Sequence, residues 1–193
     1  MTISVLGLGN VLMSDDGLGP VAVRAFEAEY VVPADMQVVD LGTPGLDLLP
    51  WLADVGRVII VDTVKSDRPP GTVRLYDKAD LLRYPPSARV GPHDPGLKEA
   101  LRALELAGRA PREVTLIGVV PASTAIGLEL TPPVRSAVAT VLVAIEVTLA
   151  RFGRPVAQRT RQRRMPPASI FDLPLADAAI DQLDRPSGAH PRT

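Results

Sequence analysis

The sequence predicts an α/β fold, a three-layer α/β/α sandwich built on a mainly parallel, twisted sheet. Short apolar runs alternate with helical patterns along the chain, which is typical of this class. Hydrophobic residues make up 46% of the chain but aromatic residues only 4%, so the core must be aliphatic, as in a parallel sheet buried under helices. The length of 193 residues suits one domain with a modest extension.

The predicted strands are short runs of apolar or β-branched residues. The clearest is Val58–Val61, where four β-branched residues in a row lead into Asp62. The others are Ile3–Leu6, which we expect Gly7 to stop, Met36–Asp40, the possible edge strand Thr72–Tyr76, and Glu113–Val120, which Pro121 stops.

The predicted helices fall between these strands. Pro20 opens the first helical pattern, a second helix lies near Leu46–Ala53, and a third runs from about Gly96 to Ala107. Thr131 is placed to cap a last helix, with Pro132 at its first position. Apolar residues then recur at a helical period, which predicts a helix packed on the sheet and not a membrane span: Val134, Val138, Val141, Leu142, Ile145 and Leu149.

The character of the chain changes after Gly153, so we divide it into a domain over residues 1–153 and a tail over residues 154–193. Arg159–Arg164 holds four arginines in six residues, and prolines recur to the end. The tail is predicted to be mostly disordered, with a short helix at Leu175–Leu183 as one alternative within it. The basic run is interpreted as a solvated segment, with a docking role as the alternative.

Composition excludes several classes of function. The formal net charge of −1 gives no electrostatic basis for binding nucleic acid or an anionic membrane. Because the chain has no cysteine, it has no disulfide, thiolate metal site or cysteine nucleophile. The first residues resemble neither a signal peptide nor a membrane span, and we expect a cytoplasmic protein.

Acidic residues cluster where the predicted strands end. Asp15 and Asp16 follow the first strand, Asp40 ends the second, and Asp62 follows Val58–Val61. Ligand sites in open parallel sheets form at the carboxyl ends of the strands. Any one of these aspartates alone would be read as a helix cap or a turn residue, but several on one edge indicate a site.

His93 is the only histidine of the predicted domain, because His190 lies in the tail. It occupies a loop before a helix and is expected on the same edge as the aspartates, although a surface or capping role is the alternative. An imidazole with two carboxylates is a set of nitrogen and oxygen ligands that suits zinc, nickel or another borderline divalent metal.

The turn Gly7-Leu8-Gly9-Asn10 also allows a dinucleotide-binding loop. That interpretation is weak, because Leu12 stands where the fingerprint needs its third glycine and because Asp15 and Asp16 would repel a pyrophosphate. The chain has no Walker-type Gly-Lys-Ser/Thr and no Gly-x-Ser-x-Gly nucleophile motif.

Specific motifs are similar to those of the hydrogenase maturation endopeptidases. Gly7–Gly19 resembles their opening signature, and His93 falls where the histidine of the family falls. The other matching segments are Asp40-Leu41-Gly42-Thr43, Ile59–Asp62, Leu116–Pro121, and Gly127-Leu128 with Thr131. The similarity spans about residues 3 to 150, and the motifs occur in the order of the family. Leu41 replaces a common glycine, and some family members carry Glu at the position of Asp16.

The resemblance implies an endopeptidase that removes a short C-terminal peptide from the nickel-loaded large subunit of a nickel–iron hydrogenase. Its partner is then the large-subunit precursor, and nickel is supplied by that substrate. Asp16, Asp62 and His93 are the implied metal-contacting and catalytic set. Asp40, Gly42 and Thr43 belong to the implied substrate loop.

Two mechanisms fit these residues. Either the three side chains contact the substrate's nickel, which activates the scissile carbonyl or a water, or the carboxylates act as an aspartic pair that shares a proton. We favour the first, because an imidazole beside two carboxylates suits a metal. Asp15 either orients its neighbour or takes part directly. A chaperone that binds nickel-loaded hydrogenase without cutting it, and a nucleotide-binding module, are the alternative functions.

Overall fold

The computed structural model describes residues 2–83 and 96–159 and contains a five-stranded sheet with the order β3-β1-β4-β6-β5. Its strands are β1 (Ile3–Leu8), β3 (Met36–Gly42), β4 (Arg57–Thr63), β5 (Val73–Asp77) and β6 (Glu113–Val119). Neighbouring strands are parallel except β5, an edge strand that pairs antiparallel with β6. The mainly parallel sheet and the edge strand are therefore confirmed.

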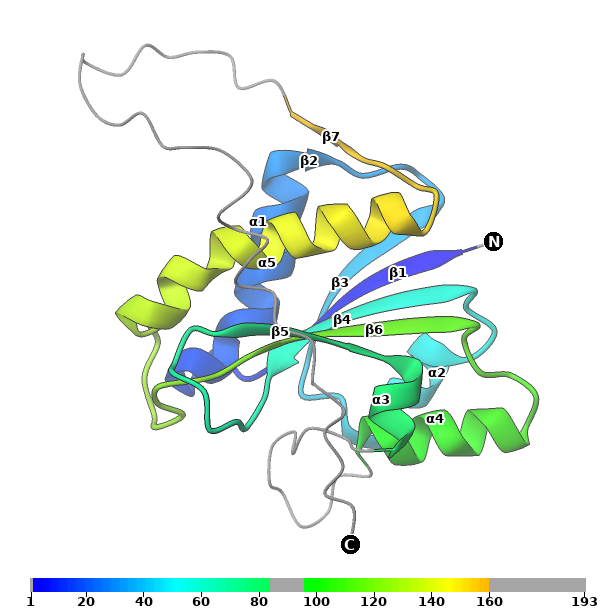
Figure 1. Ribbon diagram of the computed structural model, residues 1–193, viewed down its shortest axis with the longest axis horizontal. Helices are drawn as coiled ribbons and strands as arrows, with labels where there is room; N and C mark the ends of the chain where they lie inside the picture. Colours follow the sequence, from blue (N-terminus) through cyan, green and yellow to red (C-terminus); the bar gives the residue numbers. More distant parts are fainter. Residues whose placement is uncertain (1, 84–95, 160–193) are drawn as a thin grey trace, which may run out of the picture.

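Helices cover both faces of the sheet, which confirms the three-layer sandwich (Figure 1). One face carries α1 (Leu18–Glu29) and α5 (Pro132–Arg151). The other carries α2 (Leu49–Leu52), α3 (Lys78–Arg83) and α4 (Leu97–Leu106). Two 3₁₀ turns, η1 (Ser14–Gly17) and η2 (Gly45–Leu48), precede α1 and α2.

Alternation along β4 divides the aliphatic core into two clusters. Ile59 and Val61 belong to the cluster under α1 and α5, whereas Val58 and Ile60 belong to the cluster under α2, α3 and α4. Successive strand residues point to opposite faces, so a strand buried on both sides needs an unbroken apolar run. That is why Val58–Val61 predicts its strand so clearly.

Three strands extend two residues beyond their predicted ends. Gly7 does not stop β1, because it pairs with Asp40 on one side and Val61 on the other. β3 continues to Gly42 and β4 to Thr63. Asp40 and Asp62 therefore lie within the last residues of hydrogen-bonded strands, and the sheet fixes their backbone positions.

The helix α5 is confirmed at its predicted start, Pro132, and its apolar residues pack on the sheet and on α1. Within the described part of the chain, only this helix is long and apolar enough to cross a membrane by length and composition alone. Helix α1 begins at Leu18, two residues before the predicted start at Pro20. Pro20 is tolerated there because the N–H groups of the first helical turn have no partner within the helix.

Beyond Gly153, where we placed the domain boundary, the described chain continues to Arg159 and packs against the end of α1. The short strand β7 (Ala157–Gln158) pairs antiparallel with β2 (Tyr30–Val31), and the backbone N–H of Arg159 donates to the carbonyl oxygen of Glu29 at 2.7 Å. The rest of the predicted tail, with its alternative helix at Leu175–Leu183, lies outside the described residues.

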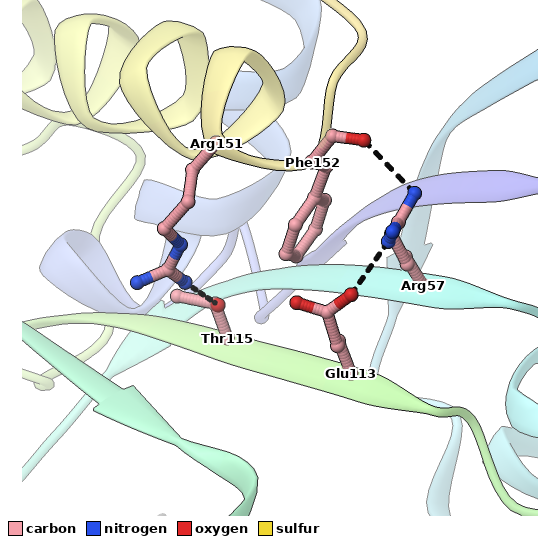
Figure 2. Close-up of polar contacts among 5 residues, drawn as sticks. All are labelled: Arg57, Glu113, Thr115, Arg151 and Phe152. Carbon is pink, nitrogen blue, oxygen red and sulfur yellow. Dashed lines mark hydrogen bonds and ion pairs between the residues drawn. The ribbon is translucent and has the colours of Figure 1, made fainter.

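A polar cluster joins the end of α5 to the start of the sheet (Figure 2). Arg57 donates to Glu113 at 2.7 Å and to the carbonyl oxygen of Phe152 at 2.9 Å, and its guanidinium lies 5.5 Å from the Phe152 ring centre. Arg151 donates to the Thr115 hydroxyl at 3.0 Å. Because Arg57 and Glu113 are the first residues of β4 and β6, this cluster lies at the amino ends of the strands.

The Arg57→Ala substitution is expected to lower the free energy of unfolding by about 1 to 2 kcal/mol, because it removes a partly exposed ion pair, a hydrogen bond and a cation–π contact together. Urea denaturation followed by circular dichroism measures the change. Arg109→Ala, which breaks only the exposed pair with Asp54, is the matched control and should shift the midpoint much less. Equal shifts would contradict the anchoring role of Arg57.

Candidate active site

Gly9, directly after β1, and Gly19, in the first turn of α1, let the chain pack closely against itself. Gly9 has a φ of 145°, and a Cβ built there would lie 1.9 Å from the carbonyl oxygen of Asp16. A Cβ on Gly19 would lie 2.1 Å from the carbonyl oxygen of Leu8. These contacts account for the glycine pattern without a bound phosphate, which leaves the dinucleotide interpretation without its main support.

Asp16 is buried in η1, immediately before α1. The backbone N–H of Asn10 donates to its Oδ2 at 3.0 Å, and the hydroxyl of Thr63 donates to its Oδ1 at 3.4 Å. The first bond folds the loop back over η1, and the second connects the loop to the end of β4. The carboxylate of Asp16 is therefore held in place from two sides.

Asp62 is the second-last residue of β4 and is also buried. Burial raises the pKa of its carboxyl from 3.8 to about 7, although the hydrogen bond from the backbone N–H of Thr63, 2.7 Å from Oδ1, acts in the opposite direction. A carboxyl group with such a pKa exchanges a proton near neutral pH. It can therefore serve as an acid, as a base, or as a ligand that ionises when a cation arrives.

Thr63, the last residue of β4, makes a hydrogen bond to each of the two carboxylates. Its N–H binds Asp62, and its hydroxyl binds Asp16. Strand alternation places Thr63 on the same face as Val61, the face that α1 covers, and from there the hydroxyl reaches η1. Thr63 was not among the predicted site residues. Its only signal was a β-branched hydroxyl residue directly after a strand-end aspartate.

Asp15 is fully buried and holds the loop between β6 and α5. Its carboxylate accepts the backbone N–H groups of Ala122, Ser123 and Thr131 at 2.8, 2.9 and 2.7 Å, and the hydroxyl of Thr131 at 2.9 Å. Thr131 occupies the N-cap position of α5, but its hydroxyl makes no cap bond, contrary to the prediction. The geometry favours the alternative in which Asp15 orients its neighbour.

The predicted substrate loop connects to the same edge. Asp40 pairs with Arg24 at 2.7 Å and accepts the N–H of Gly42 at 3.0 Å. Gly42, with a φ of 56°, accepts the N–H of Gly9 through its carbonyl oxygen at 2.7 Å. Thr43 is exposed just beyond. Asp40 thus fixes the shape of the loop, and Gly42 ties it to the loop that carries Asp16.

His93 lies outside the described residues, so the predicted set of three is represented in the structure by Asp16 and Asp62. Over residues 2–83 and 96–159, no three histidine, aspartate or glutamate side chains come together as a metal-binding group. Two carboxylates at one sheet edge supply oxygen donors, and such donors can complete a borderline divalent site when an imidazole joins them.

Comparison with known proteins identifies the family of the chain. The family model for hydrogenase maturation proteases matches residues 20–147, about two thirds of the chain. The hydrogenase expression/formation protein HupD of Bradyrhizobium diazoefficiens is 35% identical over 167 residues, which cover 82% of this chain and 87% of that protein. The hydrogenase 2 maturation protease of Escherichia coli is 33% identical over 154 residues, covering 79% and 93%.

Solved structures agree with this result. The hydrogenase maturating endopeptidase HybD from E. coli superposes with a TM-score of 0.77 at 32% sequence identity, over 83% of this chain and 99% of that one. Shared sequence and shared fold agree with each other. The chain therefore belongs to the hydrogenase maturation protease family, and it is an endopeptidase of hydrogenase maturation.

Proposed function

We propose that this endopeptidase removes a short C-terminal peptide from the large subunit of a nickel–iron hydrogenase after nickel has been inserted. Membership of the maturation protease family supports the reaction class. The main support for the site is that Thr63, at the carboxyl edge of the sheet, makes hydrogen bonds to two buried carboxylates, those of Asp16 and Asp62. No finding favours the chaperone or the nucleotide-binding module.

In this proposal Asp16, Asp62 and His93 contact the nickel that the substrate brings. A divalent metal at a scissile bond polarises the carbonyl or lowers the pKa of a bound water. The residues of this chain would then position the metal-loaded segment, and Asp62 would hold or release a proton near neutral pH. In the aspartic-type alternative the two carboxylates would share a proton. The pKa of Asp62, raised by burial, would let this carboxyl hold that proton near neutral pH.

We further propose that the segment Asp40–Thr43 contacts the chain of the substrate. Support comes from Thr43, which is exposed beside the site, and from Gly42, whose hydrogen bond to Gly9 joins this segment to the loop of Asp16. We place the reaction in the cytoplasm, before the large subunit is assembled or exported.

A cleavage assay tests the proposal. Purified large-subunit precursor, with and without nickel, is incubated with the wild-type protein, with Asp16→Asn or with His93→Ala. Mass spectrometry measures the masses of the products. We expect nickel-dependent loss of a C-terminal peptide by the wild-type protein, and a rate lower by about a hundredfold or more in both variants. Arg57→Ala, at the far end of the strands, is the control that should cleave normally.

Different outcomes separate the candidate functions. Normal cleavage by His93→Ala would remove the histidine from the site, and cleavage of the nickel-free precursor at the same rate would remove the metal from the mechanism. A wild-type protein that binds the loaded precursor but never cuts it would support the chaperone instead.

A further inference from the structure

Two loops beside the site expose an unusual concentration of large apolar side chains. In the described part of the chain, nine large apolar side chains are exposed, and five of them lie in the segments 11–13 and 126–128. They are Val11, Leu12, Met13, Ile126 and Leu128, and we call them the two-loop surface. Single exposed apolar residues are ordinary, whereas a cluster of them indicates an interaction site.

Hydrogen bonds join the two loops into one surface. Met13 and Gly127 form an isolated parallel bridge. The N–H of Ser14 donates to the carbonyl oxygen of Gly127 at 2.8 Å, and the N–H of Gly127 donates to the carbonyl oxygen of Leu12 at 3.0 Å. Asp15 adds its four bonds to the second loop. The exposed side chains are therefore presented on a fixed scaffold.

The two-loop surface borders the candidate active site. The N–H of Asp16 donates to the carbonyl oxygen of Met13 at 3.1 Å, and the N–H of Asn10, next to Val11, donates to the Asp16 carboxylate. These bonds place the two-loop surface directly next to Asp16. In Figure 1 the loops that follow β1 and β6 lie together at the end of the sheet opposite the N-terminus.

The surface is almost free of charge. Residues 10–14 carry no charged side chain, and residues 121–131 carry only Glu129, which pairs with Arg135 at 3.6 Å. An uncharged apolar surface selects a partner by burying apolar area and not by steering charges. The occupant is thus expected to present an apolar, uncharged patch close to its cleavage site.

We propose that the two-loop surface docks the folded body of the large-subunit precursor next to its C-terminal extension. This inference rests on the proposed function, because it takes the precursor as the substrate. Docking through Ile126 and Leu128 holds the precursor while its C-terminal segment lies over Asp16 and Asp62. The surface therefore makes the protein bind the whole precursor more tightly than a peptide with the sequence of the short extension alone.

The test measures binding separately from cleavage. All variants are made in the Asp16→Asn background, and their affinity for nickel-loaded precursor is measured by biolayer interferometry. We expect Ile126→Ser with Leu128→Ser, and independently Leu12→Ser, to weaken binding at least tenfold. Leu106→Ser, which changes an equally exposed leucine on α4, is the matched control and should bind like its parent. In protein that keeps Asp16 and can cleave, the same substitutions should raise KM more than they lower kcat.

The outcomes distinguish this proposal from the proposed function. If wild-type protein fails to cleave but the two-loop variants still lose binding, docking stands and the endoproteolytic proposal fails. Unchanged affinity in folded two-loop variants, or no binding of the precursor by the wild-type protein, overturns docking. A wild-type dimer that these substitutions dissociate without loss of precursor binding also overturns it, because the occupant is then a second copy of the chain.

Discussion

Asp62→Asn is expected to be more stable than the wild-type protein at pH 8 and to process precursor at least about a hundredfold more slowly. Burial raises the pKa of the Asp62 carboxyl to about 7 in the folded protein, whereas the unfolded chain keeps a value near 3.8. Between these values the folded state holds a proton that the unfolded state has lost. Wild-type stability therefore falls as pH rises from about 4 to about 7, by at most about 1.4 kcal/mol per pH unit for this group.

Urea denaturation at several pH values between 4.5 and 8 measures this effect. The free energy of unfolding of Asp62→Asn minus that of the wild-type protein should grow with pH and become constant above about 7. An asparagine carries no proton equilibrium, so the slope belongs to Asp62 alone. A difference that does not change with pH would show that the Asp62 carboxyl is ionised throughout this range, and its role as a proton donor would then fail.

Asp15→Ala is expected to lower the free energy of unfolding by about 3 to 5 kcal/mol, because several donors to a buried carboxylate lose their acceptor together. The carboxylate binds three backbone N–H groups and the Thr131 hydroxyl. A typical domain has only about 5 to 15 kcal/mol of stability, so the variant should lose a large share of it. Asp15→Asn should recover only part of the loss, since its amide N–H₂ would face donors.

The urea midpoint of Asp15→Ala measures that loss, and Asp54→Asn provides its control. Asp54 is also an aspartate that pairs with another segment, but it is exposed, and asparagine tolerates its φ of 60°. Its substitution should change the midpoint little. If Asp15→Ala were equally mild, the hydrogen bonds of Asp15 would not be what joins the loop of Asp16 to the loop before α5.

The sequence predicted the parts of the fold that depend on local patterns. The β-branched run Val58–Val61 and the helical period from Val134 to Leu149 each show directly which residues of the element are buried. Both elements were confirmed. Strand ends were harder to predict. Gly7 was expected to break β1, but a small residue was needed there, since a Cβ would lie 2.4 Å from the carbonyl oxygen of Gly19.

The sequence predicted that Asp16 and Asp62 lie at the carboxyl edge of the sheet, but not the hydrogen bonds that hold the side chains there. Asp16 and Asp62 were found because parallel strands end on one edge. The role of Asp15 depends on partners more than a hundred positions away, such as Thr131, and no local pattern indicates such a contact. The link through Thr63 depends on the strand face that β4 presents to η1. The pairing of β7 with β2 was missed because strands of two residues carry no periodic signal.

The position of Arg159 has a practical consequence for handling the protein. Its backbone and guanidinium bind the carbonyl oxygens of Glu29, Glu27 and Tyr30 at the last turn of α1. Helix α1 begins beside the site and runs back along the sheet, so this attachment lies at the amino ends of the strands. An affinity tag, a fluorophore or a surface linker that replaces residues 160–193 would therefore start at the end of the strands opposite the candidate site.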